Sequence, residues 1–216
     1  MKKETTMKNN KSGLLSLILA TAMTFSTAYE SQSALSLVNG DFQDTTGLTD
    51  LGGGWYAGVP NGWTGNNGSY SVMNWYSGNL AANLQVLGPA GGSFITLYQS
   101  AGLLDSTGTV TLTFDIVNLG SAFNLGAAIY NAPAGGSPAT TWTPLANATY
   151  TLASGFSQTL QALNVAANTP IAVAFWSGNG VLVDNVNVIP EPSAFSLMVA
   201  GSGLTFLLAA QRRRQS

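Results

Sequence analysis

Between residues 34 and 189 the chain alternates apolar and polar positions in short runs, which turn residues separate. The clearest run is 109–117, where every second residue from Val110 to Ile116 is apolar and threonines and Asp115 lie between. Such alternation is typical of a half-buried antiparallel strand. The same pattern predicts strands at 94–100, 125–130, 148–153, 157–165, 171–176 and 181–189, with weaker patterns at 35–38, 70–76 and 82–87.

Turn signals rich in glycine and proline separate these runs, for example at 88–92, 105–108 and 133–138. No amphipathic helix stands out in this part of the chain, and no repeat of fixed period indicates a solenoid. About ten short strands with such turns predict an all-β fold, an antiparallel β-sandwich of the jelly-roll type. We expect residues 34–189 to form this single domain.

The charges of the chain are divided unevenly along its length. Four lysines precede residue 12 and three arginines follow residue 211, so residues 34–189 contain no Lys, Arg or His. Their six aspartates give a net charge of −6 (0 basic minus 6 acidic). A domain without cations cannot neutralise phosphates, which excludes nucleic acid as a partner.

The absence of histidine and cysteine from the sequence removes further functions. It excludes a Ser-His-Asp triad, a thiol nucleophile and a zinc site of thiolate or imidazole ligands. It also means that burial must hold the fold together without disulfides. Oxygen ligands remain, so calcium is the plausible metal, although no cofactor is certain.

The first 33 residues have the three parts of a secretory signal peptide. Lysines are followed by an apolar run from Gly13 to Phe25, and small residues then offer cleavage after Ala28 or after Ser33. We therefore expect export through the inner membrane.

The C-terminal residues 190–214 have an equally distinct order: a tripeptide, an apolar segment and a basic cluster. Eighteen uncharged residues, 193–210, would span roughly 27 Å as a helix, which is close to the thickness of a bilayer. The basic cluster behind them would stay in the cytoplasm, so the body of the protein lies across the membrane. The tripeptide is Pro190, Glu191 and Pro192, and the basic cluster is Arg212, Arg213 and Arg214.

This order resembles the PEP-CTERM sorting signal of Gram-negative bacteria that make extracellular polysaccharide. The resemblance implies that a membrane peptidase of the exosortase type recognises Pro190, Glu191 and Pro192, while Arg212 to Arg214 retain the chain. It further implies a transient membrane helix at 193–210 and a passenger that reaches the periplasm, the cell surface or the extracellular matrix. The alternative is an ordinary C-terminal anchor behind a chance Pro-x-Pro.

Three short motifs of the passenger resemble the carbohydrate-binding-module-like jelly rolls of the galactose-binding-like superfamily. Residues 37–43 look like their NGxFE start, residues 59–64 like the following P-x-GW, and residues 181–186 like the final hhhDNV strand. In those modules the acids of the first and last motifs help to hold a structural calcium. The resemblance thus implies a calcium site that uses Asp184 with Asp41 or Gln43, although Gln43 is an amide where the family has an acid. The alternative is that Asp184 accepts hydrogen bonds from backbone amides in a turn or at a strand end.

Six aromatic residues fall within 22 positions in a segment rich in glycine and asparagine. Flat rings can stack on the apolar faces of sugars, and asparagine can bond to hydroxyls in either sense. Large rings are also the usual filler of sandwich cores, and we expect Trp63, which follows Gly62, to be buried, so both roles stay open for the set. The candidates for glycan contact are Trp55, Tyr56, Trp63, Tyr70, Trp75 and Tyr76.

Together these features predict an exported, non-catalytic protein, sorted by an exosortase and associated with extracellular polysaccharide or biofilm matrix. Its uncharged surfaces suit a neutral glycan. One alternative is a structural surface protein that self-associates, because edge strands without lysines favour association. A second is a calcium-dependent enzyme, since some bacterial cyclases have this module fold and use an aspartate as acid, the role that Asp184 would take.

Overall fold

The computed structural model describes residues 35–66, 71–76, 79–84, 95–117, 124–151, 156–177 and 180–192. The predicted signal peptide, the apolar segment 193–210 and Arg212 to Arg214 lie outside these ranges, so their roles stay predictions. Among the described residues, no helix has the length and apolar character needed to cross a membrane.

The described residues fold into strands, and the longest follow the alternating runs of the sequence. The strands are β1 Thr49–Gly52, β2 Trp55–Ala57, β3 Thr64–Asn66, β4 Ser71–Tyr76, β5 Asn79–Asn83, β6 Ile95–Leu104, β7 Gly108–Val117, β8 Asn124–Asn131, β9 Thr143–Thr151, β10 Ser157–Val165, β11 Thr169–Ser177 and β12 Leu182–Pro192.

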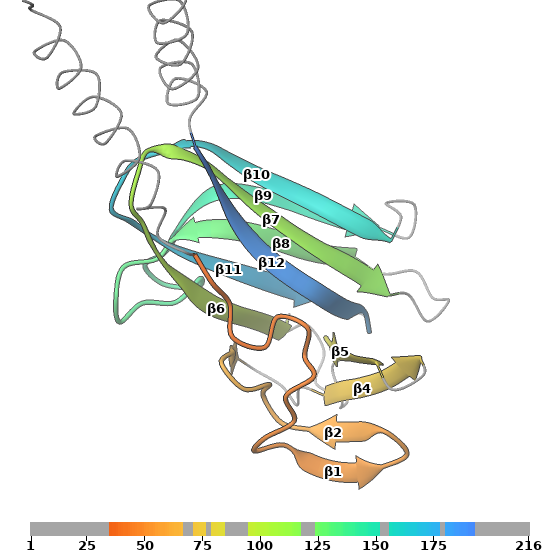
Figure 1. The fold of residues 1–216 in the computed structure, drawn as a ribbon. Helices are drawn as coiled ribbons and strands as arrows, with labels where there is room; N and C mark the ends of the chain where they lie inside the picture. The colour runs from red at the N-terminus through yellow and green to blue at the C-terminus, as the bar shows by residue number, and fades with distance from the viewer. Residues whose placement is uncertain are drawn as a thin grey trace, which may run out of the picture. The chain divides into compact units, whose positions relative to one another are not determined.

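These strands form two antiparallel sheets that stack as the layers of a sandwich (Figure 1). The seven-stranded sheet has the order β1-β2-β4-β5-β12-β7-β10, and the five-stranded sheet has the order β3-β6-β11-β8-β9. Neighbours in the sheets are distant in sequence; β12, for instance, pairs with both β5 and β7. The prediction of an all-β antiparallel sandwich is therefore confirmed.

The core lies between the sheets and is built by the inward positions of each alternating strand. Phe114 from β7 meets Phe175 from β11 edge to face, with ring centroids 5.0 Å apart. Phe114 also makes an edge contact with Tyr150 from β9, at 5.3 Å. Aromatic pairs in this geometry add to the stability that burial of their area already gives. One continuous cluster of buried side chains thus joins the two layers.

The sequence pattern predicted some strands closely and missed others. β10 has the predicted bounds and β7 differs by one residue, while the short strands β1, β2 and β3 were not predicted. Residues 35–38 form no strand. The Ser36 amide does donate to the Ala101 carbonyl of β6 at 3.0 Å, but the backbone of Val38 bonds to a side chain, so the pairing does not continue. The Val38 amide donates to Gln99 Oε1 at 2.8 Å, and Gln99 Nε2 donates to the Val38 carbonyl at 3.0 Å.

The Pro-Glu-Pro tripeptide, which follows the predicted domain of residues 34–189, forms the end of β12. Pro190, Glu191 and Pro192 lie opposite Val110, Thr109 and Gly108 of β7. On its other side β12 pairs with β5 at Leu182 and Val183 alone among the described residues. Proline is tolerated where a strand has an open edge, since no partner there needs its missing donor.

Candidate functional site

The outer face of the five-stranded sheet carries an aromatic layer. The sheet register places Tyr98 of β6 opposite Ala174 of β11, which in turn lies opposite Ala128 of β8. Ala174 and Ala128 have 0% of their surface exposed, although their neighbours along each strand are the residues that point into the core. Small side chains at the centre of this face therefore lie beneath a cover.

Trp142 provides part of that cover from the loop of residues 132–142. Its ring meets Tyr98 edge to face, with centroids 5.1 Å apart, and lies 5.9 Å from the ring of Tyr130 on β8. Because β11 lies between β6 and β8, a ring that contacts both must lie across β11. Trp142 therefore bridges the face, above the strand that carries Ala174.

The loop that holds Trp142 is closed by local hydrogen bonds. The carbonyl of Ser137 accepts from the amides of Thr140, Thr141 and Trp142, at 3.1 to 3.3 Å. Gly136 lies against the indole, since a Cβ there would come within 2.9 Å of Trp142 Nε1. This nitrogen is buried and has no hydrogen-bond partner among the described residues.

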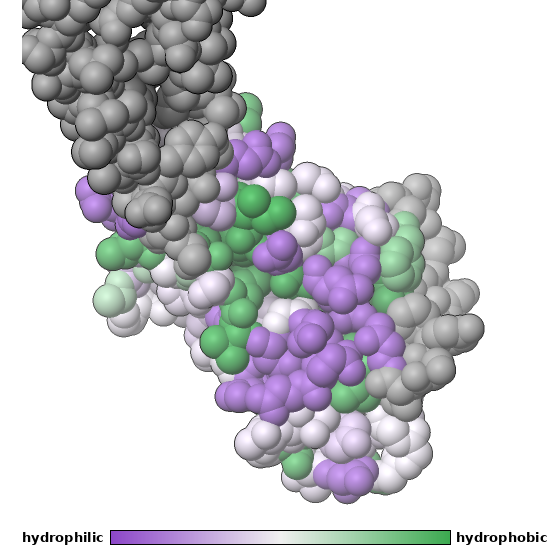
Figure 2. All heavy atoms as spheres, in the orientation of Figure 1, coloured by the Kyte–Doolittle hydropathy of each residue, from purple (hydrophilic) through white to green (hydrophobic). Residues whose placement is uncertain are grey.

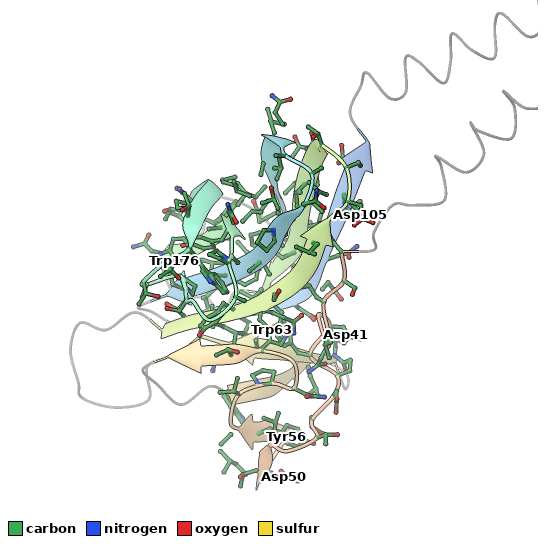
Figure 3. All side chains as sticks on the ribbon, turned by 90° about the vertical axis from the view of Figure 1, so that its left-hand side faces the viewer. Asp41, Asp50, Tyr56, Trp63, Asp105 and Trp176 are labelled. Carbon is green, nitrogen blue, oxygen red and sulfur yellow. The ribbon has the colours of Figure 1, made fainter. Side chains whose placement is uncertain are left out.

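Trp176 continues the aromatic layer along β11. It lies opposite Gly126 of β8, and an ideal Cβ on Gly126 would come within 1.9 Å of Trp176 Cε2. The indole thus covers the backbone of Gly126 directly, at a place that no larger residue could share. Figure 3 shows Trp176 on the side of the sandwich away from β7 and β12, whereas Trp63 lies between the layers.

We call Tyr98, Tyr130, Trp142 and Trp176 the aromatic face. None of the five strands of its sheet contains a charged residue, and neither does the loop of residues 132–142. Burial raises the pKa of the Tyr130 hydroxyl above its ordinary value, so this group also stays neutral. Thr149 lies opposite Gly126 and is exposed, so an uncharged hydroxyl flanks the rings. The aromatic face offers flat apolar surfaces beside neutral hydrogen-bonding groups.

The aromatic residues that sequence density singled out lie elsewhere. Trp63 is 6% exposed, and its ring packs 5.3 Å from Phe42 and 6.2 Å from Phe175, so it is a core residue that a glycan cannot reach. Trp55 and Tyr56 form β2 of the seven-stranded sheet, with Trp55 37% exposed and Tyr56 packed against the core.

The other candidates of that set stay predictions. Trp75 and Tyr76 lie in β4 by their backbone, and the structure describes no side chain there. Tyr70 lies outside the described residues.

The residues of the aromatic face were missed because they are scattered over the sequence. The alternation does place Tyr98, Tyr130 and Trp176 at positions where a strand of a two-layer sandwich faces outward, which is an unusual place for large rings. That signal was available. Trp142 lies in a loop, and no pattern indicates that it folds back over the sheet.

The candidate calcium ligands Asp184, Asp41 and Gln43 do lie near one another, where the loop of residues 35–48 meets β12 and β5. The Val186 amide donates to the Gly40 carbonyl at 2.8 Å, which brings the first and last motifs into direct contact. Figure 2 shows hydrophilic residues gathered over this loop and the neighbouring end of β12. Figure 3 labels Asp41 in the same loop.

The donors at this place do not fit a calcium ion. Calcium takes six to eight oxygen ligands, but the central atom here is the amide nitrogen of Gln43. It donates to the Asp41 carbonyl at 2.8 Å, to Asn79 Oδ1 at 3.0 Å and to the Leu80 carbonyl at 3.1 Å. The Asp41 carboxylate accepts the Gln43 backbone amide at 3.4 Å, within its own turn. A hydrogen-bond donor thus stands where a cation would need an acceptor.

Asp184 is 1% exposed in a domain without cations, so its carboxylate needs other partners. Asn79 Nδ2 donates to its Oδ2 at 2.7 Å, and the Asn185 backbone amide donates to its Oδ1 at 2.7 Å. Asn185 Nδ2 also donates to Asp115, the residue opposite Asp184, at 2.8 Å. Amide donors therefore stabilise two facing carboxylates that would otherwise repel each other.

The Pro-Glu-Pro tripeptide is hydrogen-bonded to a side chain of the same sheet. Thr111 Oγ1 donates to Glu191 Oε1 at 2.7 Å, and Gln161 Nε2 donates to Thr111 Oγ1 at 3.2 Å. The carboxylate of the tripeptide is therefore held by β7, and β10 supports that contact from the next strand.

A scan against models of protein families and a search among curated proteins gave no match. Solved structures with this fold include an apo-form cyclase from Fischerella sp., 16% identical, with a TM-score of 0.55 over 76% of this chain and 98% of the cyclase. A CBM4 carbohydrate-binding module is 19% identical, with a TM-score of 0.46 over 72% of this chain and 100% of the module. TmCBM61, solved with β-1,4-galactotriose, is 14% identical, with a TM-score of 0.41 over 74% of this chain and 100% of that module. At these identities the likeness to the cyclase concerns the fold alone: this chain is an antiparallel β-sandwich of the same kind.

Proposed function

We propose that the domain binds an uncharged polysaccharide through the aromatic face, outside the inner membrane and without catalysis. The observation that carries this proposal is the complete absence of charged residues from the five-stranded sheet and its 132–142 loop, combined with the four rings gathered there. Rings of this kind stack on sugar faces, and hydroxyl and amide groups beside them bond to sugar hydroxyls. A charged glycan would find no counter-ion on this sheet.

The same feature supports a role in binding without turnover. Hydrolysis of a glycoside needs two carboxyl groups that flank the bond. The strands under the aromatic face supply none, and Asp44, Asp115 and Asp184 each accept hydrogen bonds elsewhere in the domain.

Binding is tested by affinity electrophoresis of the full chain in mild detergent, through gels that contain neutral glucans, xylans, galactans or the polysaccharide of the producing cells. Trp142→Ala and Tyr98→Ala should each weaken retention roughly tenfold, since about 1.4 kcal/mol of lost contact is a factor of ten. Trp55→Ala is the matched control, because Trp55 is exposed on the opposite sheet. Equal retention of all three variants, or no retention of the wild type on any neutral glycan, would refute the proposal.

Delivery follows the PEP-CTERM order at the C-terminus, with an exosortase as partner and a transient membrane helix. Glu191→Ala, or deletion of Arg212–Arg214, should leave the protein in the membrane fraction of the producing cells. Because Glu191 also accepts a hydrogen bond from Thr111, the matched control is Thr111→Val, which removes this contact and keeps the tripeptide. Normal release of the Glu191→Ala variant would exclude recognition of the tripeptide, and retention of Thr111→Val would show a merely structural role.

Self-association in a matrix is the second candidate function, and the edges of the sheets favour it. The edge strands β9 and β10 are nine residues each and contain no charged residue that would oppose pairing. Leu163 on β10 is 67% exposed. Sedimentation of the full chain should then show concentration-dependent assembly that Leu163→Lys abolishes. A wild-type chain that stays monomeric at high concentration would remove this candidate.

A further inference from the structure

Three oxygen atoms converge on the side-chain nitrogen of Gln43. The Asp41 carbonyl comes from the same turn, whereas Asn79 Oδ1 and the Leu80 carbonyl come from β5, almost forty residues away. All three lie within 3.1 Å of this one nitrogen. Oxygens that converge in this way repel one another unless a donor or a cation lies between them.

The Gln43 amide supplies that donor. Its NH₂ group has two hydrogens for three acceptors, so at least one hydrogen is shared. The contacts extend inward, because Asn79 accepts from Gln43 and donates to the buried Asp184 of β12. One side chain thus joins the loop of residues 35–48 to β5 and, through Asn79, to β12.

We propose that Gln43 takes the place of a bound cation, and that this domain consequently folds without calcium although its motifs resemble calcium-binding modules. The amide provides the positive hydrogens that a cation would provide as a full charge. The same geometry assigns a latent site: Gln43→Glu would exchange the donor for a carboxylate of the same length. Glutamate, two carbonyl oxygens and Asn79 Oδ1 would then face one another, with the charge of Asp184 behind them. Such a set of oxygens binds calcium.

The experiment compares thermal unfolding of the full chain, in mild detergent, in EDTA and in calcium. The wild-type protein should melt at the same temperature in EDTA and in calcium. Gln43→Glu should melt below wild type in EDTA and rise by roughly 5–10 °C in calcium at about a hundred times its Kd. Gln158→Glu on β10 is the matched control, because it adds the same charge far along the sheet, and it should not respond to calcium.

Gln43→Met tests the contact without adding a charge, because methionine has the same length and no donor. This variant should melt at a lower temperature than wild type, and calcium should not change its melting temperature. The proposal is overturned if wild type gains as much from calcium as Gln43→Glu does, or if Gln43→Met melts with wild type. It is also overturned if Gln43→Glu behaves alike in EDTA and calcium, whether folded or unfolded in both. A Gln43→Glu chain that folds in calcium alone would support it.

Discussion

The contact between Gly126 and Trp176 allows the packing of the aromatic face to be tested quantitatively. In Gly126→Ala the new methyl group would lie 1.9 Å from Trp176 Cε2, whereas ordinary contact begins near 3.4 Å. The ring must therefore move by about 1.5 Å (3.4 minus 1.9). Overpacking of this kind costs about 1–3 kcal/mol. Replacing a strand glycine by alanine recovers about 0.5–1 kcal/mol, so the net loss should be roughly 0–2.5 kcal/mol.

The same substitution should have the opposite sign when the ring is absent. In a Trp176→Ala background, Gly126→Ala meets no indole and should stabilise the protein by about 0.5–1 kcal/mol. The difference between the two backgrounds, about 1–3 kcal/mol, is the coupling energy of a double-mutant cycle. It is measured by urea unfolding of the four full-length proteins, followed by far-ultraviolet circular dichroism so that the loss of an indole does not affect the signal.

The result that would refute this reasoning is additivity. If Gly126→Ala changes the free energy of unfolding equally in both backgrounds, within about 0.5 kcal/mol, Trp176 does not lie against residue 126. Glycan retention of Gly126→Ala then gives a second readout. A ring displaced from the aromatic face should weaken binding, whereas an unmoved ring should leave it unchanged.

Trp63→Phe should lower the free energy of unfolding by about 1–3 kcal/mol, measured in urea, because the smaller ring leaves a space in the core and the Asn39 carbonyl loses one of its two donors. The indole donor 3.1 Å away is lost and the Phe42 amide at 3.2 Å remains, and glycan retention should not change. Hydrogen bonds from Thr46 and from Asn61 lower the Asp44 pKa from 3.8 to about 2. Asp44 therefore stabilises the fold above pH 3.8, and the difference in Tm between wild type and Asp44→Asn should vanish as pH falls through about 2. Gly136→Ala would place a methyl group 1.9 Å from Thr141 Oγ1 and close to Trp142, so glycan retention should weaken. Unchanged retention would place Trp142 outside the binding surface.

The fold was predictable where one face of a strand is buried and the other is not. In β7 every second residue points into the core, so alternation fixed both the strand and its orientation. β10 follows the same rule, as do most of the longer strands. The strands β1, β2 and β3 are only three or four residues long, so they are too short for an alternating pattern to mark them.

The failure at residues 35–38 has a specific physical cause. Their pattern is apolar and extended, but Gln99 satisfies the Val38 backbone from the side, and Asn39 then turns with a φ of 54°. At Val38 a side chain more than sixty residues away thus takes the backbone bonds that a neighbouring strand would make, and local periodicity does not indicate this.

The candidate site was less predictable than the fold, because the register between paired strands determines which side chains lie side by side. Density of rings along the chain pointed to the segment from Trp55 to Tyr76, yet its best-defined member, Trp63, is needed in the core. Tyr98 and Trp176 are 78 residues apart in sequence and share one face through the pairing of β6 with β11. The motif resemblance did indicate that Gln43, Asp41 and Asp184 lie near one another, and the amide at residue 43 is the departure from that motif, where it donates hydrogen bonds.

A sheet without ions also determines how its contacts respond to the surroundings. Coulombic attachment fades as the Debye length shrinks from about 30 Å at 0.01 M to about 3 Å at 1 M salt, and it changes whenever a carboxylate or an amine titrates. Stacking on Tyr98, Trp142 and Trp176 requires no ion pair and no carboxylate or amine that titrates. Salts such as sulfate, which are excluded from protein surfaces, strengthen apolar contacts. Glycan bound to these rings should therefore be retained about equally in dilute buffer and in concentrated salt.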